Sequence, residues 1–454
     1  MSAIDEQILG GRRLATAINV DERERRFQQA QASVHQELVA ALELSKLSAG
    51  HPERVRSHVR RMAEHVCKNR SAALQDIDQG RLVDSVLNET FGLGPLEPLL
   101  ADPEISDILV NGPETVYIER RGKLELTKII FADEAHLLRT IQRIVSRLGR
   151  RIDEASPLVD ARLPDGSRVH AAIRPLALDG PVLSIRRFGV DPFRMPNLLD
   201  LGSIVPDMAT FLEAAVRSRL GMIISGGTGA GKTTMLNALS EYIPDGERLV
   251  TIEDSAELVL RHRHRVRLEC RPANADGVGE VSARELVRNS LRMRPDRIIV
   301  GEVRGPEVWD MLQAMNTGHE GSLTTIHANS AGDALTRLEM MVAMTGFELP
   351  IPVVRQYLIS GVRILVHLSR LAGGRRRVMQ VTELSGIENG EIVRHDIFRF
   401  EQTGVDANND AVGEFRATGY QPECLERMKA AGISLPQGLF ATRKLTGTTE
   451  RTGR

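Results

Sequence analysis

The sequence predicts an α/β fold in which a mostly parallel sheet is covered by helices, and three observations support this prediction. Between residues 206 and 400, short apolar runs alternate with segments whose apolar side chains recur at helical spacing. One apolar run leads into a glycine-rich loop and then into a helix, as in phosphate-binding β–α units. The 454 residues are 42% hydrophobic, which is enough for the cores of two or three domains.

The N-terminal segment is expected to be helical. Residues 1–20 show no regular pattern and are expected to be disordered. Within residues 21–90, Asp21 can cap a first helix, and apolar side chains then recur at helical spacing from Val55 and from Leu82. We therefore expect a small helical bundle ahead of the other domains.

Residues 91–190 are expected to form an α+β domain. Proline and glycine separate this segment from the bundle, and strand-like runs alternate with turn sequences along it. Apolar side chains at helical spacing predict one helix at residues 137–148. Strands are expected at residues 107–110, 115–118, 124–131, 158–163, 169–173 and 182–185.

A linker at residues 191–205 is expected to lead into the main α/β domain at residues 206–400, which a hairpin near residues 373–390 should end. Its strands are expected at residues 221–225, 249–253, 297–301, 323–327 and 364–368. Its helices are expected at residues 206–219, 233–241, 282–293, 306–315 and 331–344. Residues 401–454 should form a partly disordered C-terminal extension with one short helix at 422–431 and a disordered last dozen residues.

Residues 226–233 follow the phosphate-binding pattern G-x-x-x-x-G-K-[ST]. Gly226 and Gly231 allow a tight backbone path in which successive N–H groups point at phosphate oxygens. Lys232 supplies a positive charge for the β- and γ-phosphates, and the Thr233 hydroxyl can ligate Mg²⁺. The expected nucleotide-binding residues are Gly226, Gly227, Thr228, Gly229, Ala230, Gly231, Lys232, Thr233 and Thr234. The motif predicts a protein that binds ATP together with Mg²⁺.

The apolar run at residues 297–301 is expected to carry the acidic group that such ATPases place on a neighbouring strand. Gly301 occupies the position where the metal-binding Asp usually sits, and Glu302 follows it directly. We therefore assign Glu302 as the base or water-positioning carboxylate, with a contact to Mg²⁺ partly through water. The missing charge is expected from Glu253 or Asp254 at the end of the preceding strand, and the sequence does not decide between them.

The segment at residues 318–327 contributes two histidines, His319 and His327. His327 ends a strand that we expect beside the phosphate loop, where it could sense the γ-phosphate or bridge to the next subunit. His319 lies in a glycine-flanked loop and is a further candidate catalytic residue. A hydrogen-bonded structural histidine is the alternative for both residues. Their spacing matches no common zinc site, and no cysteine supports one.

The composition indicates the compartment of the protein and limits the partners that it could bind. The net charge of −1 provides no global field for nucleic acid or an anionic membrane. The three cysteines, Cys67, Cys270 and Cys424, are far apart and suit a reducing compartment as small apolar residues. No apolar stretch is long enough to span a bilayer, so we expect a cytoplasmic protein that reaches the membrane only through partners. The basic run at 261–265 lacks interleaved aromatics and suggests a strand edge or a subunit contact.

Together these motifs resemble those of the type II/type IV secretion and type IV pilus ATPases. In that superfamily an Asp box like residues 251–257, an atypical Walker B Gly-Glu pair and a His box like residues 318–327 occur together. The chain lacks the four-cysteine metal element of many type II secretion motors. Further segments are similar to the tight-adherence (Tad/Cpa) pilus assembly motors, namely residues 107–113, 117–122, 160–168, 183–188, 415–422 and 438–440.

The resemblance implies a RecA-like ATPase domain, preceded by an α+β domain of PAS-like type, in a hexameric ring with nucleotide bound between the two domains. Basic residues of the N-terminal domain would reach the phosphates. By motif position this role falls to Arg168 and Arg186, with Arg174 and Arg187 as weaker candidates. The resemblance also implies a motor at the cytoplasmic side of the inner membrane, where ATP hydrolysis drives a polytopic platform protein during pilus assembly or secretion.

Two other classes of function stay open at this point. A DNA-translocating RecA-type motor of a conjugation-like system would be revealed by DNA-stimulated hydrolysis. A catalytically silent, nucleotide-gated scaffold is the third class, and the intact Lys232, Thr233 and Glu302 argue against it.

Overall fold

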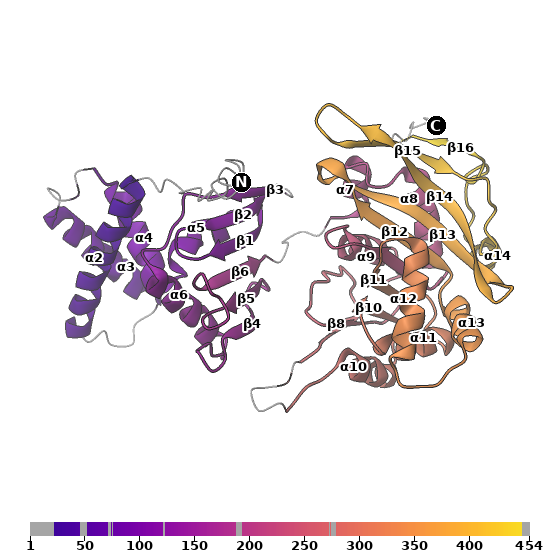
Figure 1. Cartoon of the computed structure of the whole chain (residues 1–454), viewed down its shortest axis with the longest axis horizontal. Coiled ribbons are helices and arrows are strands. Elements are labelled where there is room, and N and C mark those ends of the chain that lie inside the picture. Colours follow the sequence, from indigo (N-terminus) through magenta and orange to yellow (C-terminus); the bar gives the residue numbers. More distant parts are fainter. Residues whose placement is uncertain are drawn as a thin grey trace, which may run out of the picture. The chain divides into compact units, whose positions relative to one another are not determined.

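The computed structural model describes residues 22–45, 52–70, 74, 76–120, 123–187, 193–271, 273 and 278–446. The chain divides between Val190 and Asp191 into two compact units, and each unit has its own hydrophobic cores (Figure 1). Residues 1–20, for which disorder is expected, lie outside the described residues.

The first unit opens with three helices, α2 (Glu22–Ser45), α3 (Pro52–Asn69) and α4 (Gln79–Phe91). They bury a common apolar cluster that includes Val34, Val59 and Val86. Glu89 on α4 connects this bundle to the following elements, because its carboxylate lies 3.1 Å from Nε2 of His136 on α6 (Glu134–Arg147). The bundle is therefore fixed to the rest of the first unit by a buried polar contact as well as by packing.

A six-stranded antiparallel sheet follows, in the order β3-β2-β1-β6-β5-β4. Its strands are β1 (Ile105–Asn111), β2 (Val116–Arg120), β3 (Lys123–Leu126), β4 (Leu158–Arg162), β5 (Arg168–Ala172) and β6 (Val182–Arg186). One face packs against α6 through side chains such as Ile108, Ile118 and Ile141. The short elements η1 (Gly94–Leu96) and α5 (Glu97–Ala101) connect α4 to β1.

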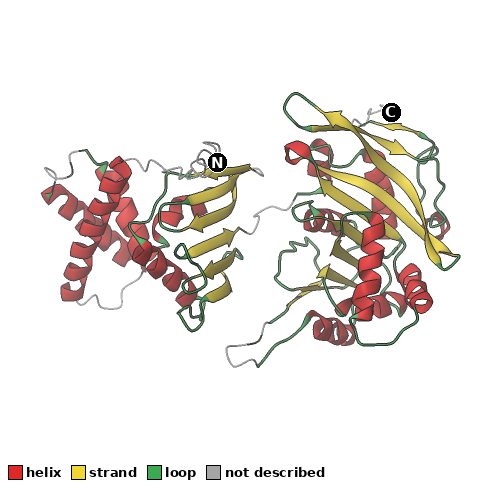
Figure 2. Ribbon diagram, in the orientation of Figure 1, coloured by secondary structure: helices red, strands yellow, loops and turns green. Residues whose placement is uncertain are grey.

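The second unit is built on a ten-stranded mixed sheet in the order β16-β15-β14-β13-β12-β7-β11-β10-β8-β9, visible as the yellow strands of Figure 2. The strands are β7 (Met222–Gly226), β8 (Leu249–Glu253), β9 (Arg265–Glu269), β10 (Arg297–Val303), β11 (Leu323–His327), β12 (Ile364–Arg370), β13 (Arg376–Glu388), β14 (Glu391–Val405), β15 (Ala411–Ala417) and β16 (Arg443–Leu445). Strands β12, β7, β11, β10, β8 and β9 are parallel, and β13 to β16 continue the sheet antiparallel. The prediction of an α/β fold is therefore confirmed, and the sheet is a mixed one.

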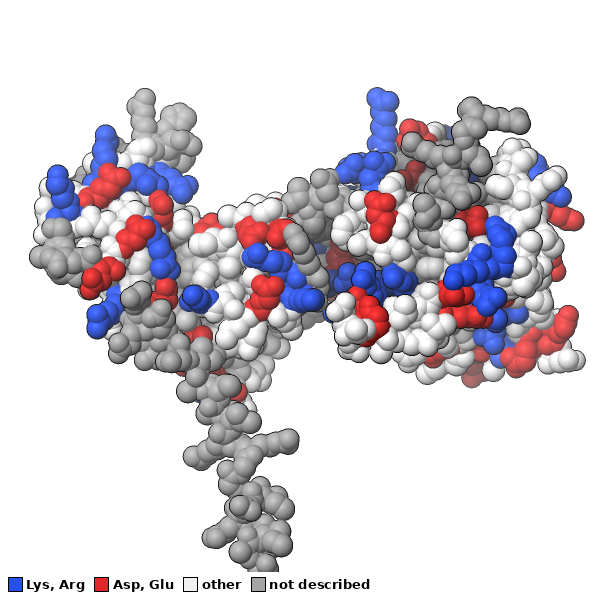
Figure 3. Space-filling view, turned by 90° about the horizontal axis from the view of Figure 1, so that it is seen from above, with Lys and Arg blue, Asp and Glu red and all other residues white. Residues whose placement is uncertain are grey.

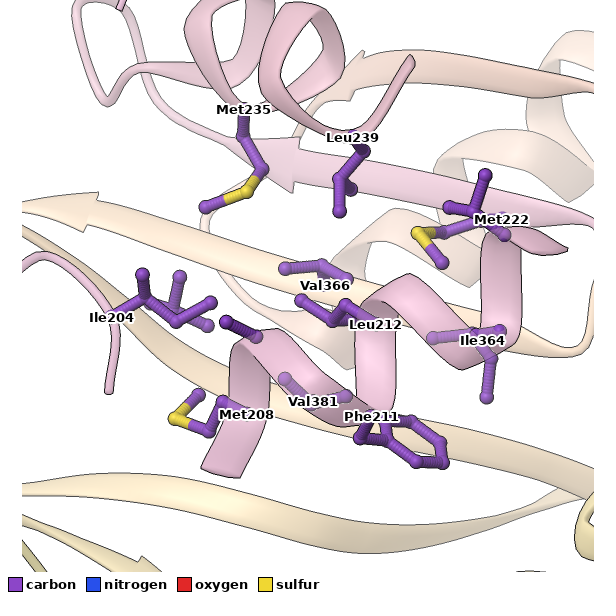
Figure 4. Packing of buried hydrophobic residues seen from close by; sticks show 14 of the residues in the cluster. Ile204, Met208, Phe211, Leu212, Met222, Met235, Leu239, Ile364, Val366 and Val381 are labelled. Atoms are coloured by element: carbon purple, nitrogen blue, oxygen red, sulfur yellow. The ribbon is translucent and has the colours of Figure 1, made fainter. Parts of the chain in front are cut away.

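Helices cover both faces of this sheet, which accounts for the continuous apolar runs of its central strands. On one face α7 (Met195–Asp200), α8 (Pro206–Arg217) and α9 (Lys232–Ser240) bury a large cluster with the C-terminal strands. Figure 4 shows part of it, where Met208 and Phe211 of α8 pack beside Val381 of β13 and Met235 of α9 lies close by. The other face carries α10 (Ala283–Ser290), η2 (Leu291–Met293), α11 (Glu307–Asn316), α12 (Ala331–Ala343) and α13 (Ile351–Gly361).

Several elements differ from expectation. The expected strand 124–131 ends at Leu126, after which buried Phe131 packs into the core from an irregular segment. Helix α7 lies within the expected linker at 191–205. Helix α13 was not predicted because prolines flank its start, although Pro352 sits in its first turn, where proline fits a helix.

The C-terminal segment also differs from expectation. Strand β14 crosses the boundary expected at residue 400, and β15 and β16 extend the same sheet, so this segment continues the α/β core. Aromatic side chains hold it in place, since Phe398 and Phe440 pack on Phe211 with ring centroids 5.9 and 5.8 Å away. The expected short helix is α14 (Leu425–Ala430); the short η3 (Ala372–Gly374) lies earlier in the chain, between β12 and β13. Of the last dozen residues, those of β16 are ordered, whereas residues 447–454 lie outside the described part.

Among the described residues, no helix combines the length and the apolarity that crossing a membrane requires.

Candidate functional site

The phosphate-loop motif lies at the carboxyl edge of the second sheet, between β7 and α9. Strand β7 is buried and sits between β11 and β12, so the loop leaves the middle of the sheet. Gly231 is the residue before α9 and has φ of 97°, a left-handed conformation that suits glycine. A Cβ atom on Gly226 would lie 2.4 Å from the carbonyl oxygen of Leu368 on β12. Gly226 and Gly231 are therefore required by the backbone path itself.

Lys232 begins α9 and points back over the loop. Its Nζ donates a hydrogen bond to the carbonyl oxygen of Gly227 at 3.2 Å and lies 3.9 Å from Oε1 of Glu302. Burial lowers the pKa of Lys232, and the charge of Glu302 acts in the opposite direction. Thr233 and Thr234 follow in the first helical turn, where their positions suit a metal ion and a phosphate at the positive end of the helix.

Glu302 lies near the end of β10 and faces the loop. Its Oε2 is 2.6 Å from Nη2 of Arg304, and its Oε1 is 3.2 Å from Nε2 of His327. Oε1 is buried and has no hydrogen bond of good geometry among the described residues. The carboxylate is thus held on one side by Arg304 and presents a second oxygen that remains available for a water molecule.

His327 is the last residue of β11, and it pairs in register with Gly226 at the start of the loop. This pairing explains how the histidine reaches Glu302 from a neighbouring strand. Its pKa is lowered, first by burial and then by the positive charge of Lys232. At neutral pH the ring is therefore neutral, with one nitrogen available as a donor and one as an acceptor.

The sequence did not decide between Glu253 and Asp254 as the second carboxylate. In the structure Glu253, at the end of β8, is the one that points inward. Its side chain is buried, and Oε1 accepts hydrogen bonds from the backbone N–H groups of Glu257 at 2.8 Å and Leu258 at 2.7 Å. Burial raises its pKa, and these two hydrogen bonds lower it. Asp254 is half exposed and pairs with Arg304 at 3.2 Å. Glu253 is therefore the better candidate for the missing carboxylate.

The packing around Gly301 explains why no aspartate stands there. A Cβ atom at this position would lie 2.9 Å from Cγ of Glu253, closer than side chains normally approach. The Glu253 side chain from β8 fills the space that an Asp side chain on β10 would need. Its Oε2 is buried and has no hydrogen-bond partner among the described residues.

These donors fit a hard divalent cation such as Mg²⁺, because a buried carboxylate oxygen without a partner and a hydroxyl are oxygen ligands. Thr233 and Glu253 would hold the ion, and Glu302 would contact it through water. Within the described residues no group of three His, Cys, Asp or Glu side chains forms a metal site of its own.

The structure does not bring His319 together with the other candidate site residues. It precedes β11, whereas His327 ends it, so the two histidines stand at opposite edges of the sheet. The imidazole of His319 contacts the backbone carbonyl of Pro295, with Nδ1 3.0 Å from the oxygen. The fold of this chain therefore does not bring His319 to the phosphate loop.

The arginine candidates belong to the first unit. Arg168 and Arg186 are direct cross-strand partners on β5 and β6, and both are exposed. Arg168 also lies 3.3 Å from Asp160. Arg174 pairs with Glu134, and Arg187 donates to backbone carbonyls beside β1, which leaves these two with structural contacts.

Sequence reasoning missed two arginines at the loop. Arg304 lies two residues after Glu302, a spacing that puts both side chains on one side of an extended segment, so this neighbour was predictable. Arg376 begins β13, and its Nε donates to the carbonyl oxygen of Gly229 at 2.9 Å. No local pattern marks Arg376, because a strand far along the chain brings it to the loop.

Comparison with known proteins shows the family of the chain. Residues 89–394 match the family described as Type II/IV secretion system protein. The chain is 42% identical over 306 residues to a Mycobacterium tuberculosis protein whose name assigns it provisionally to conjugal transfer, covering 66% of this chain and 86% of that protein. It is 32% identical over 305 residues to the type IV secretion system protein VirB11 of Brucella suis, covering 61% of this chain and 84% of that protein.

A crystal structure of the Brucella suis VirB11 ATPase in complex with sulphate covers 65% of this chain and 97% of its own at 30% identity, with a TM-score of 0.36. That score is too low to support an argument about the fold. The family match, in contrast, extends over more than half of the chain, from the end of α4 into β14. The protein belongs to the type II/IV secretion system protein family.

Proposed function

We propose that this protein is an ATPase motor that hydrolyses ATP to power pilus assembly or secretion. The observation that carries the proposal is the position of Glu302, a half-buried carboxylate 3.9 Å from Lys232 and 3.2 Å from His327 beside the phosphate loop. A carboxylate held next to the phosphate-binding lysine is suited to orient water for attack on a γ-phosphate. The family match supports a secretion-type motor.

In the proposed mechanism each residue has a separate task. The backbone of the loop and Lys232 hold the β- and γ-phosphates, and the start of α9 adds its positive end. Glu302 orients the attacking water and accepts its proton, while His327 contacts the same carboxylate and is close enough to report whether a γ-phosphate is present. Mg²⁺, when bound through Thr233 and Glu253, would offset charge on the phosphate oxygens.

Arg304 has a place in the same scheme. It bridges Glu302 and Asp254, so it fixes the direction of the catalytic carboxylate before substrate arrives. Charge-assisted hydrogen bonds of this kind are stronger and more directional than those between neutral groups.

The assembly is proposed to be a hexameric ring that acts on a polytopic inner-membrane platform protein from the cytoplasmic side. The N-terminal and C-terminal motifs favour the tight-adherence branch of the superfamily. In such a ring the N-terminal sheet would supply Arg168 and Arg186 to the phosphates. Their pairing on adjacent strands supports this, because one movement of the sheet would carry both charges together.

A DNA-translocating motor is the second candidate, since relatives at 42% and 32% identity are named for conjugal transfer. Features of the described residues disfavour it. The basic run at 261–265 leads into the edge strand β9, and within it His262 and His264 are engaged by Pro244 and Arg248. On the face seen in Figure 3, acidic and basic side chains are interspersed, so this face offers no continuous basic groove.

The experiment that decides between the two is ATP hydrolysis by the purified full-length protein with and without single- or double-stranded DNA at physiological salt. We expect hydrolysis that DNA does not change, and recovery of the protein with membranes only when its platform partner is present. Stimulation of several-fold by DNA would favour the translocating motor instead. Hydrolysis absent under all conditions, with ATP binding retained, would favour a nucleotide-gated scaffold.

A further inference from the structure

A group of arginines borders the phosphate loop on the side away from Glu302. Strand β12 pairs with β7 so that Leu368 lies opposite Gly226, which brings the end of β12 to the start of the loop. The turn between β12 and β13 then adds a high local positive charge. Arg375 lies in the turn itself, Arg370 ends β12, and Arg376 and Arg377 begin β13.

Two of these arginines contact or approach the loop. Arg370 and Arg376 are direct cross-strand partners, so their side chains share one face of the sheet. Nε of Arg376 donates a hydrogen bond to the carbonyl oxygen of Gly229 at 2.9 Å. Its Cδ would be 3.6 Å from a Cβ atom on Gly231, and Nη1 of Arg370 would be 3.7 Å from one on Gly229. The side chain of Arg376 therefore lies along the phosphate loop.

The other two arginines of the turn are occupied elsewhere. Arg375 pairs with Asp410 at 2.7 Å, and Arg377 donates to the carbonyl oxygen of Leu201 at 3.1 Å. Arg376, in contrast, has no ion-pair partner among the residues that the structure describes. No carboxylate of the described residues therefore neutralises its charge, which contributes to the potential at the loop.

The order of the strands indicates which part of a nucleotide these charges would meet. Strands β11 and β12 flank β7 on opposite sides. His327 and Glu302 lie on the β11 side, so a γ-phosphate held by Lys232 would point towards them. Arg370 and Arg376 lie on the β12 side, at the same edge of the sheet. They are therefore near the parts of the nucleotide that ATP and ADP share.

We propose that Arg376 is a positioning residue for nucleotide binding, which braces the phosphate loop through the carbonyl of Gly229 and, together with Arg370, strengthens binding of ATP and ADP alike. This inference rests on the proposed ATPase function. It assigns retention of nucleotide to the β12–β13 turn and hydrolysis to the β10–β11 side. Because β13 belongs to the long C-terminal part of the sheet, the C-terminal strands would take part in nucleotide binding.

The test uses the full-length protein and the variants Arg376→Ala, Arg376→Lys and Arg370→Ala, with Arg375→Ala as the matched control from the same turn. KM and kcat for ATP are measured together with the dissociation constants of ADP and of a non-hydrolysable ATP analogue. We expect Arg376→Ala to raise KM and both dissociation constants about tenfold, as loss of a charge-assisted hydrogen bond implies, with kcat nearly unchanged. Arg376→Lys should lie between wild type and Arg376→Ala, and Arg375→Ala should match wild type.

Thermal melting without nucleotide shows whether each variant is folded. If Arg376→Ala does not fold, the exposed Arg370→Ala carries the test and should raise the dissociation constant for ADP in the same direction. Unchanged dissociation constants in the folded variants, or a fall in kcat at constant KM, would overturn the inference while leaving the ATPase proposal intact. A wild-type protein that binds no ATP would instead refute the proposed function.

Discussion

The two sides of the phosphate loop differ in chemistry. On the side of β11, β10 and β8, the functional side chains are His327, Glu302 and Glu253, and two carboxylate oxygens there are buried without a hydrogen bond among the described residues. On the side of β12 and β13, the side chains are arginines, and Arg376 is held by a loop carbonyl. The acidic side is suited to activate water and hold a metal ion, and the basic side is suited to retain nucleotide.

The two sides of the loop are formed by different kinds of strands. The acidic side comes from short parallel strands whose carboxyl ends meet at one edge of the sheet, where ligand sites of α/β folds occur. The basic side comes from an antiparallel pair that is joined to the parallel sheet through β12. Changes on the acidic side should therefore reduce the rate, and changes on the basic side should reduce affinity.

The largest effect is expected from Lys232→Ala, which removes the charge that both sides share. Hydrolysis should be lost and nucleotide binding weakened, because the β- and γ-phosphates lose their lysine. Phosphate release and nucleotide titration measure the two quantities separately. Turnover at the wild-type rate would contradict the assignment of the phosphate loop.

The next effect concerns charge supplied from the first unit. An arginine that reaches the γ-phosphate from outside can contribute about 10³–10⁵ in rate. We expect Arg168→Ala and Arg186→Ala each to lower turnover at least about tenfold without unfolding the protein. Arg174→Ala is the control, since Arg174 is exposed and pairs with Glu134 at 3.1 Å.

A truncated chain tests the same contribution of the N-terminal unit to hydrolysis. A protein of residues 200–454 should bind ATP and hardly hydrolyse it, because it retains the loop and Glu302 but lacks the N-terminal sheet. Steady-state hydrolysis and nucleotide binding by the same preparation provide the comparison. Full activity of the truncated chain would refute the contribution of the N-terminal arginines.

The smallest effect is on stability and comes from Glu253. Burial raises the pKa of Glu253 above the ordinary value of a glutamate, so the folded protein binds this proton more tightly than the unfolded chain does. The stability from this proton is present below the unfolded pKa and is lost as pH rises through the folded pKa. Above the folded pKa the protein carries a buried charge at a cost in folding free energy.

Glu253→Gln should therefore raise the melting temperature of the nucleotide-free protein at pH 7.5, by on the order of 2–4 °C. The gain should shrink as the pH falls towards 4, where wild-type Glu253 is itself protonated. The same variant should need more Mg²⁺ for half-maximal hydrolysis. A melting temperature that Glu253→Gln lowers equally at all pH values would contradict the view that this carboxylate is kept for function.

The sequence predicted most of the acidic side and little of the basic side. The loop, Glu302 and His327 were predictable, because local motifs mark them and the expected strand at 323–327 coincides with β11. The choice between Glu253 and Asp254 was not, since neighbouring residues at a strand end point to opposite sides and only packing against Gly301 shows which is inward.

The separation of His319 from the phosphate loop has a related physical cause. A strand of five residues spans about 16 Å, so two histidines of one motif can stand at opposite edges of the sheet. Arg376 could not be predicted, because its contact with Gly229 depends on the register between β12 and β13. Such a register is set by pairing over a long hairpin and has no local sequence signal.

The central claim is that Glu302 activates water while Glu253 serves the metal ion, and one comparison of variants tests it directly. Glu302→Gln and Glu253→Gln are assayed for ATP binding and hydrolysis over a range of Mg²⁺ concentrations. We expect Glu302→Gln to bind ATP normally and to lose about 10²–10⁴ in hydrolysis rate at every Mg²⁺ concentration. Glu253→Gln should recover part of its rate as Mg²⁺ is raised. Normal hydrolysis by Glu302→Gln, with a loss in Glu253→Gln that Mg²⁺ does not restore, would show that the two roles are exchanged.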